Sequence, residues 1–155
     1  MQRNFTYRQV NAGTPEEVFP LLCPVREADW LDGWAYRMVH SVSGVAEKDC
    51  VFATPHHGEQ ETIWQITEHD PVEKRVEFVR LTPGENAVRI GIRLEAKGEN
   101  ETYADISYLY TGLTAAQDAF IQNELPAQFQ ASMEWWERSI NHYLKTGEKL
   151  LRSGE

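Results

Sequence analysis

The apolar residues of the last third of the chain repeat once per helical turn. They fall at Leu125, Phe129, Met133, Trp136, Ile140, Tyr143 and Leu144. This spacing places them on one face of a helix. The opposite face carries a polar stripe, which consists of Gln130, Glu134, Glu137, Asn141 and Lys145. We therefore predict an amphipathic helix over 126–146, about 30 Å long, with its stripe in solvent and its apolar face against the rest of the chain.

Seven stretches upstream of this helix alternate between apolar and polar residues, a period typical of β-strands. They cover 5–10, 34–42, 50–54, 62–68, 75–81, 87–96 and 102–111. A turn signal with glycine or proline follows each stretch, which suits an antiparallel meander. Two short helices are predicted between the first two strands. One begins at the capping box Thr14-Pro15-Glu16-Glu17 and the other covers 26–31.

The last helical region is predicted in two parts. A capping pattern at Thr114 begins a short helix that runs to about Asn123, and Pro126 then interrupts the helical stretch. Gly147 is a natural C-terminal stop. A chain of 155 residues suits one ordinary domain. We predict a single domain over 1–147 and a frayed tail over 148–155.

Each predicted strand has one apolar face and one polar face. Over 87–96, Val88, Ile90 and Ile92 alternate with Arg89 and Arg93. Such a sheet is covered on one side and solvated on the other, and the long helix is the only predicted element large enough to cover it. A twisted sheet of seven strands curls. A straight helix laid across it leaves an interior cavity unless large side chains fill the space.

Eight side chains are candidates to line that cavity and bind a ligand. They are Trp64, Phe78, Arg80, Tyr108, Tyr110, Phe129, Met133 and Trp136. A filled core is the alternative interpretation of the aromatic members, since ligand pockets and cores are both apolar and aromatic. Arg80 is the unusual member, because an arginine on an apolar face must be paired or must meet an anion. It could also turn outward from the strand end.

The order of elements and several local motifs resemble the START-like superfamily, also called SRPBCC or Bet v 1-like. Some of these motifs are similar to a bacterial subgroup described as polyketide cyclase/dehydrase-like. The motifs are Thr14-Pro-Glu-Glu-Val-Phe19, Leu22-Cys-Pro-Val-Arg-Glu27, Asp29-Trp-Leu-Asp-Gly-Trp34, Trp64-Gln-Ile-Thr67 with Asp70-Pro71, and Tyr108-Leu-Tyr-Thr-Gly112. The resemblance implies an α+β helix-grip fold. In it, a seven-stranded curved antiparallel sheet wraps around a long C-terminal helix, with two short helices after the first strand.

The resemblance also implies a range of functions. The first is binding or transport of a hydrophobic or amphipathic small molecule between sheet and helix, oriented here by Tyr108, Tyr110 and Arg80. The alternatives are a polyketide cyclase/aromatase-like enzyme that uses the same pocket and an Hsp90-activator-like protein-interaction module. Oxygenase domains of the superfamily bind iron through two histidines and a carboxylate. No matching motif occurs in this sequence, so that activity is not expected.

Two clusters of polar residues contain side chains that could bind a metal ion or act as a general base. His56 and His57 lie in a turn near acidic residues, but adjacent histidines in an extended chain point in opposite directions, so we predict a solvated turn and no metal site. Glu27, Asp29 and Asp32 lie beside Trp30 and Trp34. The acids of this segment either cap helices and turns, or one of them acts as a general base or orients a ligand.

Composition narrows the function further. The net charge is −9 and the pI is near 5.0, which argues against binding to nucleic acid. No stretch has the roughly 20 apolar residues of a membrane span. Cys23 and Cys50 are the only cysteines, and we expect two thiols in a reducing cytoplasm, although a disulfide between them stays open. We expect a monomer or homodimer without a cofactor.

Overall fold

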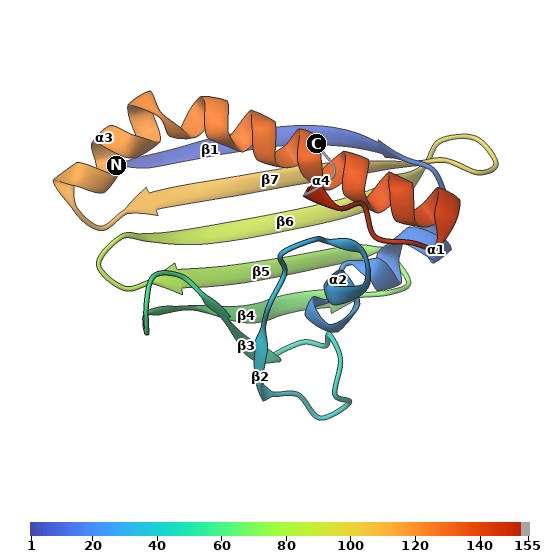
Figure 1. The fold of residues 1–155 in the computed structure, drawn as a ribbon, viewed down its shortest axis with the longest axis horizontal. Helices are drawn as coiled ribbons and strands as arrows, with labels where there is room; N and C mark the ends of the chain where they lie inside the picture. Colours follow the sequence, from blue (N-terminus) through green and yellow to red (C-terminus); the bar gives the residue numbers. More distant parts are fainter. Residues whose placement is uncertain (153–155) are drawn as a thin grey trace.

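The computed structural model describes residues 1–152 of the chain and contains the predicted order of elements (Figure 1). The elements are β1 (Gln2–Asn11), α1 (Pro15–Val18), the 3-10 turn η1 (Phe19–Leu21), α2 (Pro24–Trp30), β2 (Arg37–His40), β3 (Val51–Pro55), β4 (Glu61–Asp70), β5 (Arg75–Thr82), β6 (Asn86–Ala96), β7 (Thr102–Gly112), α3 (Ala115–Asn123) and α4 (Leu125–Thr146). The strands form one antiparallel sheet of seven in the order β1-β7-β6-β5-β4-β3-β2. The predicted helix-grip fold is confirmed.

The residues predicted to begin and end the helices do so in the structure. The Thr14 hydroxyl accepts a hydrogen bond from the Glu17 backbone N–H at 3.2 Å, and the Glu17 carboxylate accepts one from the Thr14 N–H at 3.1 Å. This reciprocal pair is a capping box and begins α1. Pro126 lies in the first turn of α4, where its missing N–H costs no helical hydrogen bond. Gly147 ends α4 in the left-handed conformation, with φ of +74°.

The two faces of the sheet differ as the alternation predicts. Val88, Ile90 and Ile92 on β6 are buried, while Arg89 between them is exposed. One register joins the strands, so that Ile66, Phe78, Ile90 and Tyr108 lie side by side on the inner face. The core of the protein is therefore the space between this inner face and the helices.

The long helix does not cross the centre of the sheet. It runs along β1 and β7, at one edge, as Figure 1 shows. Glu137 accepts a hydrogen bond from the backbone N–H of Val10 at 2.8 Å, and Asn141 donates one to the Val10 carbonyl at 2.9 Å. The prediction that the polar stripe of this helix faces solvent was therefore wrong for these two residues. Their side chains satisfy backbone groups on the free edge of β1, the edge that faces away from β7.

A second layer covers the other half of the inner face. Helix α2 and the chain that follows it lie over β4 and β5 (Figure 1), and the Phe19 ring packs against His69 of β4. The strand predicted from residue 34 begins only at Arg37, because the Trp34 backbone N–H closes a turn to the Leu31 carbonyl at 3.2 Å. The turn carries the Trp34 ring over the sheet. The inner face thus has two covers with a junction between them.

The chain beyond α4 returns to α2. Leu150 forms an isolated parallel bridge with Leu31, and the Arg152 backbone N–H donates to the Asp32 carboxylate at 3.1 Å. The frayed tail predicted over 148–155 is therefore in contact with the rest of the chain at these positions, whereas 153–155 lie outside the described residues. No helix within residues 1–152 is long and apolar enough to cross a membrane.

Candidate functional site

A cavity of about 400 Å³ lies at the junction between the two covers of the inner face. Its walls come from three parts of the chain: the end of α2 with the turn after it, the inner faces of β3 to β7, and the middle of α4. This volume falls in the range of small-molecule pockets, which begins at about 300 Å³. The curled sheet therefore leaves a space that the large side chains only partly fill.

Seven of the 17 residues that line the cavity are aromatic. Four of the five tryptophans line the cavity, namely Trp34, Trp64, Trp135 and Trp136. On the sheet, the Phe52 and Trp64 rings stack with centroids 5.3 Å apart, and Trp34 meets Trp64 edge-on at 6.2 Å. Such contacts hold the rings in fixed orientations. The cavity therefore has a rigid, apolar surface on the side of β3 and β4.

Hydrogen bonds at the back of the rings keep polar atoms out of this surface. The Trp34 indole N–H donates to the Pro24 carbonyl at 2.9 Å, and the Trp64 indole N–H donates to the Thr54 hydroxyl at 2.9 Å. Because the indole nitrogens of Trp34 and Trp64 already have hydrogen-bond partners in the protein, these two rings need no hydrogen-bond acceptor on a ligand. A molecule bound here would meet carbon faces.

Arg80 supplies a cation to this aromatic space. Its guanidinium carbon lies 5.1 Å from the centre of the Trp64 ring and 5.7 Å from the centres of both Tyr108 and Tyr110. One N–H donates to the Tyr110 hydroxyl at 2.8 Å. Within residues 1–152, no carboxylate oxygen lies within 4.0 Å of its nitrogens. The side chain thus turns inward over the rings, and the alternative of an outward-turned arginine is not realised.

Glu27 on α2 brings a carboxyl group to the same cavity. Its side chain is only 9% exposed. Burial raises the pKa of this carboxyl from 4.5 to about 8, because the charged form loses its hydration. The group is therefore mainly neutral at pH 7 and carries a proton that it can donate in a hydrogen bond.

Tyr108 is the polar group on β7. Burial is the main cause that raises the pKa of its phenol to about 12, and the nearby Arg80 opposes that rise. The hydroxyl is consequently protonated throughout the physiological range. The ring packs edge-on against Phe129 at 5.2 Å between centroids, which fixes its position beneath α4.

Six of the eight predicted site residues line the cavity, and two do not. The lining residues are Trp64, Phe78, Arg80, Tyr108, Met133 and Trp136. Tyr110 and Phe129 lie behind them, where Tyr110 holds Arg80 and Phe129 supports Tyr108. That these residues bind a ligand stays a prediction.

Sequence reasoning missed Trp135 as a lining residue. It lies next to Trp136, outside the apolar face of the helix, yet it is only 7% exposed. The Arg152 guanidinium stacks over its ring at 4.5 Å. Together with Asp32, Arg152 also lines the cavity, so the returning chain forms part of its mouth. The cluster of adjacent tryptophans was the one available signal, because a helix seldom needs two such large side chains in a row.

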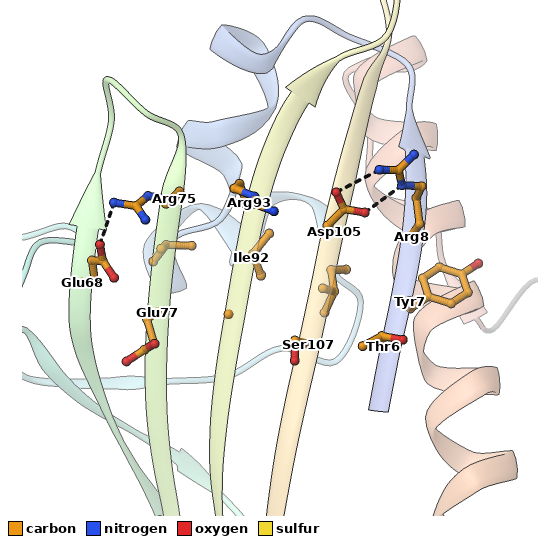
Figure 2. Close-up of a pocket in the computed structure, with 13 residues that line it drawn as sticks. Thr6, Tyr7, Arg8, Glu68, Arg75, Glu77, Ile92, Arg93, Asp105 and Ser107 are labelled. Carbon is orange, nitrogen blue, oxygen red and sulfur yellow. Dashed lines mark hydrogen bonds and ion pairs between the residues drawn. The ribbon is translucent and has the colours of Figure 1, made fainter. Parts of the chain in front are cut away.

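A second hollow, of about 490 Å³, lies on the outer face of the sheet (Figure 2). It forms above Gly91 and is lined by charged side chains. Two of its arginines pair with acids, since Arg8 contacts Asp105 at 2.7 Å and Arg75 contacts Glu68 at 3.0 Å. This surface is the charged outer face that the strand alternation predicts. Its side chains largely satisfy one another, so the inner cavity is the better candidate site.

The remaining candidates for chemistry contribute nothing to the cavity. His56 is hydrogen-bonded to Glu85 rather than to a second histidine. Cys23 and Cys50 are both buried and free, so the disulfide that the sequence left open is not formed. Burial raises the pKa of the Cys50 thiol, which makes it a weak nucleophile.

Comparison with known proteins identifies the fold. No family model and no curated protein matches the chain. Among solved structures, Ara h 8.0201 is similar over 94% of this chain and 99% of its own, at 13% identity and a TM-score of 0.67. Norcoclaurine synthase from Thalictrum flavum, in complex with dopamine and hydroxybenzaldehyde, is similar over 93% and 87%, at 11% identity and a TM-score of 0.68.

The Zhui aromatase/cyclase from Streptomyces sp. R1128 is similar over 97% of this chain and 100% of its own, at 9% identity and a TM-score of 0.68. The chain therefore has the Bet v 1-like, or SRPBCC, fold. At these identities the likeness is one of fold, which the synthase and the aromatase/cyclase share with Ara h 8.0201.

Proposed function

We propose that the protein binds a hydrophobic or amphipathic small molecule in the inner cavity, between the sheet and α4. The observation that carries this proposal is a half-open space of about 400 Å³ with seven aromatic residues in its wall. A core of a folded protein is normally packed to the density of an organic crystal, with few voids larger than a water molecule. A pocket of this size beside four tryptophans, open to solvent at its mouth, is the expected property of a binding site.

The composition of the wall indicates what such a ligand gains. Burial of its apolar surface contributes roughly 25 cal/mol for each Å², and the fixed rings of Trp34 and Trp64 require little reordering. Arg80, Glu27 and Tyr108 would then orient its polar atoms. The Thalictrum flavum synthase has the same fold and is in complex with dopamine and hydroxybenzaldehyde, which supports a small-molecule-binding function for this fold.

Filling the cavity tests the proposal. Met133 faces the cavity from α4 and Gln130, three residues before it, is exposed. Met133→Trp should therefore abolish binding of a neutral aromatic probe such as 2-naphthamide in isothermal titration calorimetry. Gln130→Trp adds the same side chain outside the cavity and should leave binding unchanged. Overpacking costs typically about 1–3 kcal/mol, so thermal unfolding of both variants checks that they fold. Equal binding by both variants would exclude the inner cavity as the site.

A cyclase-like enzyme is the second candidate, and Glu27 favours it. A carboxyl with a pKa of about 8 exchanges protons near neutral pH, as a general acid or base must. Tyr108 lines the same cavity and could hydrogen-bond a substrate carbonyl. In this case Glu27→Gln would abolish turnover of an aromatic or polycarbonyl precursor while it leaves precursor binding nearly intact. Binding of the precursor by the wild-type protein without any turnover would favour the simple binding protein.

A further inference from the structure

We propose that the ligand of the inner cavity is an anion: a molecule with an aromatic or apolar body and one carboxylate, which Arg80 binds. This inference rests on the proposed binding function and adds the charge and the shape of the ligand's polar group. It starts from the hydrogen bonds that Arg80 leaves unmade. A guanidinium has five N–H donors, and within residues 1–152 Arg80 uses one of them, on the Tyr110 hydroxyl.

The charge of Arg80 has no acidic neighbour within residues 1–152. The side chain is half-buried, and aromatic rings rather than acids surround its charge. Cation–π contacts offset part of the hydration that the guanidinium loses, and a charge withdrawn from water is normally paired with an opposite charge as well. The three rings also hold the guanidinium plane in place. A carboxylate that arrives from the cavity would find a preformed fork with free donors, which is the geometry of a bidentate pair.

The charges around the cavity also favour an anionic ligand. The protein as a whole carries a net charge of −9. Arg80 and Arg152 bring two positive charges to the cavity, and Asp32 brings one negative charge to its mouth. The Glu27 carboxyl on the facing wall is buried and forms no ion pair within residues 1–152. With Glu27 protonated, the interior of an acidic protein is locally positive. Such a reversal favours an anion and disfavours an amine.

The rest of the wall limits what the body of this anion can be. Phe52, Trp64 and Phe78 lie on the same side as Arg80 and offer ring faces and edges. Flat aromatic bodies stack on such surfaces with favourable geometry. An aryl carboxylate of one or two fused rings therefore matches both parts of the site.

A pair of probes of equal shape tests the inference. 2-Naphthoate and 2-naphthamide differ in charge but hardly in size, and both are titrated by calorimetry at pH 7. We expect wild-type protein to bind the naphthoate roughly tenfold more tightly or better, as a charge-assisted bidentate pair implies. Arg80→Gln should remove this preference, because it weakens binding of the naphthoate much more than binding of the naphthamide. Arg80→Lys should retain part of the preference, because it keeps the charge but loses the fork.

Arg89→Gln is the matched control. Arg89 is exposed on the outer face of β6 and adjoins the inward-facing Val88 and Ile90 in sequence, so its loss changes the net charge equally without altering the cavity. It should retain the wild-type preference. Equal affinity of wild-type protein for the two probes, or a preference that survives Arg80→Gln, would overturn the inference and leave the binding proposal intact. Failure of both probes to bind wild-type protein would overturn the binding proposal itself.

Discussion

The carboxylate of Glu137 on α4 accepts a hydrogen bond of 2.5 Å from the hydroxyl of Tyr7 on β1. Its second oxygen accepts the Val10 backbone N–H at 2.8 Å. Burial and this hydrogen bond raise the pKa of Tyr7 to about 12, so the phenol stays a donor at any pH at which the protein is studied. One side chain thus fastens the middle of the long helix to the free edge of the sheet.

We predict that Glu137→Ala destabilises the protein by about 1–3 kcal/mol, because it leaves a half-buried hydroxyl and a backbone N–H without an acceptor. The control is Glu134→Ala. Glu134 lies one turn earlier on the same helix and is exposed, and such substitutions change stability by about 0.5 kcal/mol or less. Urea unfolding of both variants measures the difference. Similar midpoints for the two would show that the contact does not fasten the helix.

The buried carboxyl of Glu27 predicts a pH dependence of stability. Its folded-state pKa of about 8 lies above the ordinary value of 4.5. The stability that depends on its neutral form is therefore fully present below pH 4.5 and is lost as the pH rises through 8. A shift of this size corresponds to at most about 5 kcal/mol. Glu27→Gln keeps a neutral side chain at every pH, so the variant should exceed the wild type in stability by a growing margin from pH 5 to pH 9.

Denaturant unfolding at several pH values measures that margin. The difference between wild type and Glu27→Gln is the informative quantity, because other titrating groups affect both proteins equally. A difference that stays constant from pH 5 to pH 9 would mean that Glu27 is ionised in the folded protein, and a cavity with an additional negative charge would no longer favour an anionic ligand.

The contact between Asp32 and Arg152 predicts a kinetic effect. The Asp32 carboxylate holds the backbone of the returning chain at the mouth of the cavity. Asp32→Ala should loosen this segment, so that 2-naphthamide associates and dissociates several-fold faster with little change in affinity. The neutral probe separates this effect from that of charge. Asp29→Ala removes an exposed acid that pairs with Arg26 on the same helix and should leave both rates unchanged in stopped-flow measurements. Unchanged rates in Asp32→Ala would mean that ligands enter by another route.

Local patterns of sequence predicted the fold well because local physics controls it. The alternation around Ile90 determines which face of β6 is buried, and the capping residues Thr14 and Thr114 accept the backbone N–H groups that begin their helices. Pro126 and Gly147 likewise act within one turn of their own position. None of these features depends on a distant partner, so each could be predicted from a few neighbouring residues.

The features that sequence did not predict all depend on distant partners. Glu137 looks like a solvent-exposed acid until β1, 127 residues away along the chain, brings Val10 to it. Trp135 is covered because Arg152 returns to it. The burial of Glu27 follows from the meeting of α2 with the sheet and α4. The position of the helix at the edge of the sheet, rather than across its centre, has the same origin and decides where the cavity lies.

A substitution at Gly91 can show whether the ligand binds in the inner cavity or in the outer hollow. It lies on the outer face of β6, and an added Cβ would meet no atom within 4 Å. Glycine within a strand is less stable than alanine by about 0.5–1 kcal/mol, so Gly91→Ala should stabilise the protein by about this amount. Gly112 is the matched control, because there a Cβ would collide with the Asp118 carboxylate, and Gly112→Ala should destabilise. Thermal unfolding measures both. Since Gly91→Ala partly fills the outer hollow and leaves the inner cavity intact, naphthoate binding should be unaffected. A loss of binding in this variant would place the site on the outer face instead.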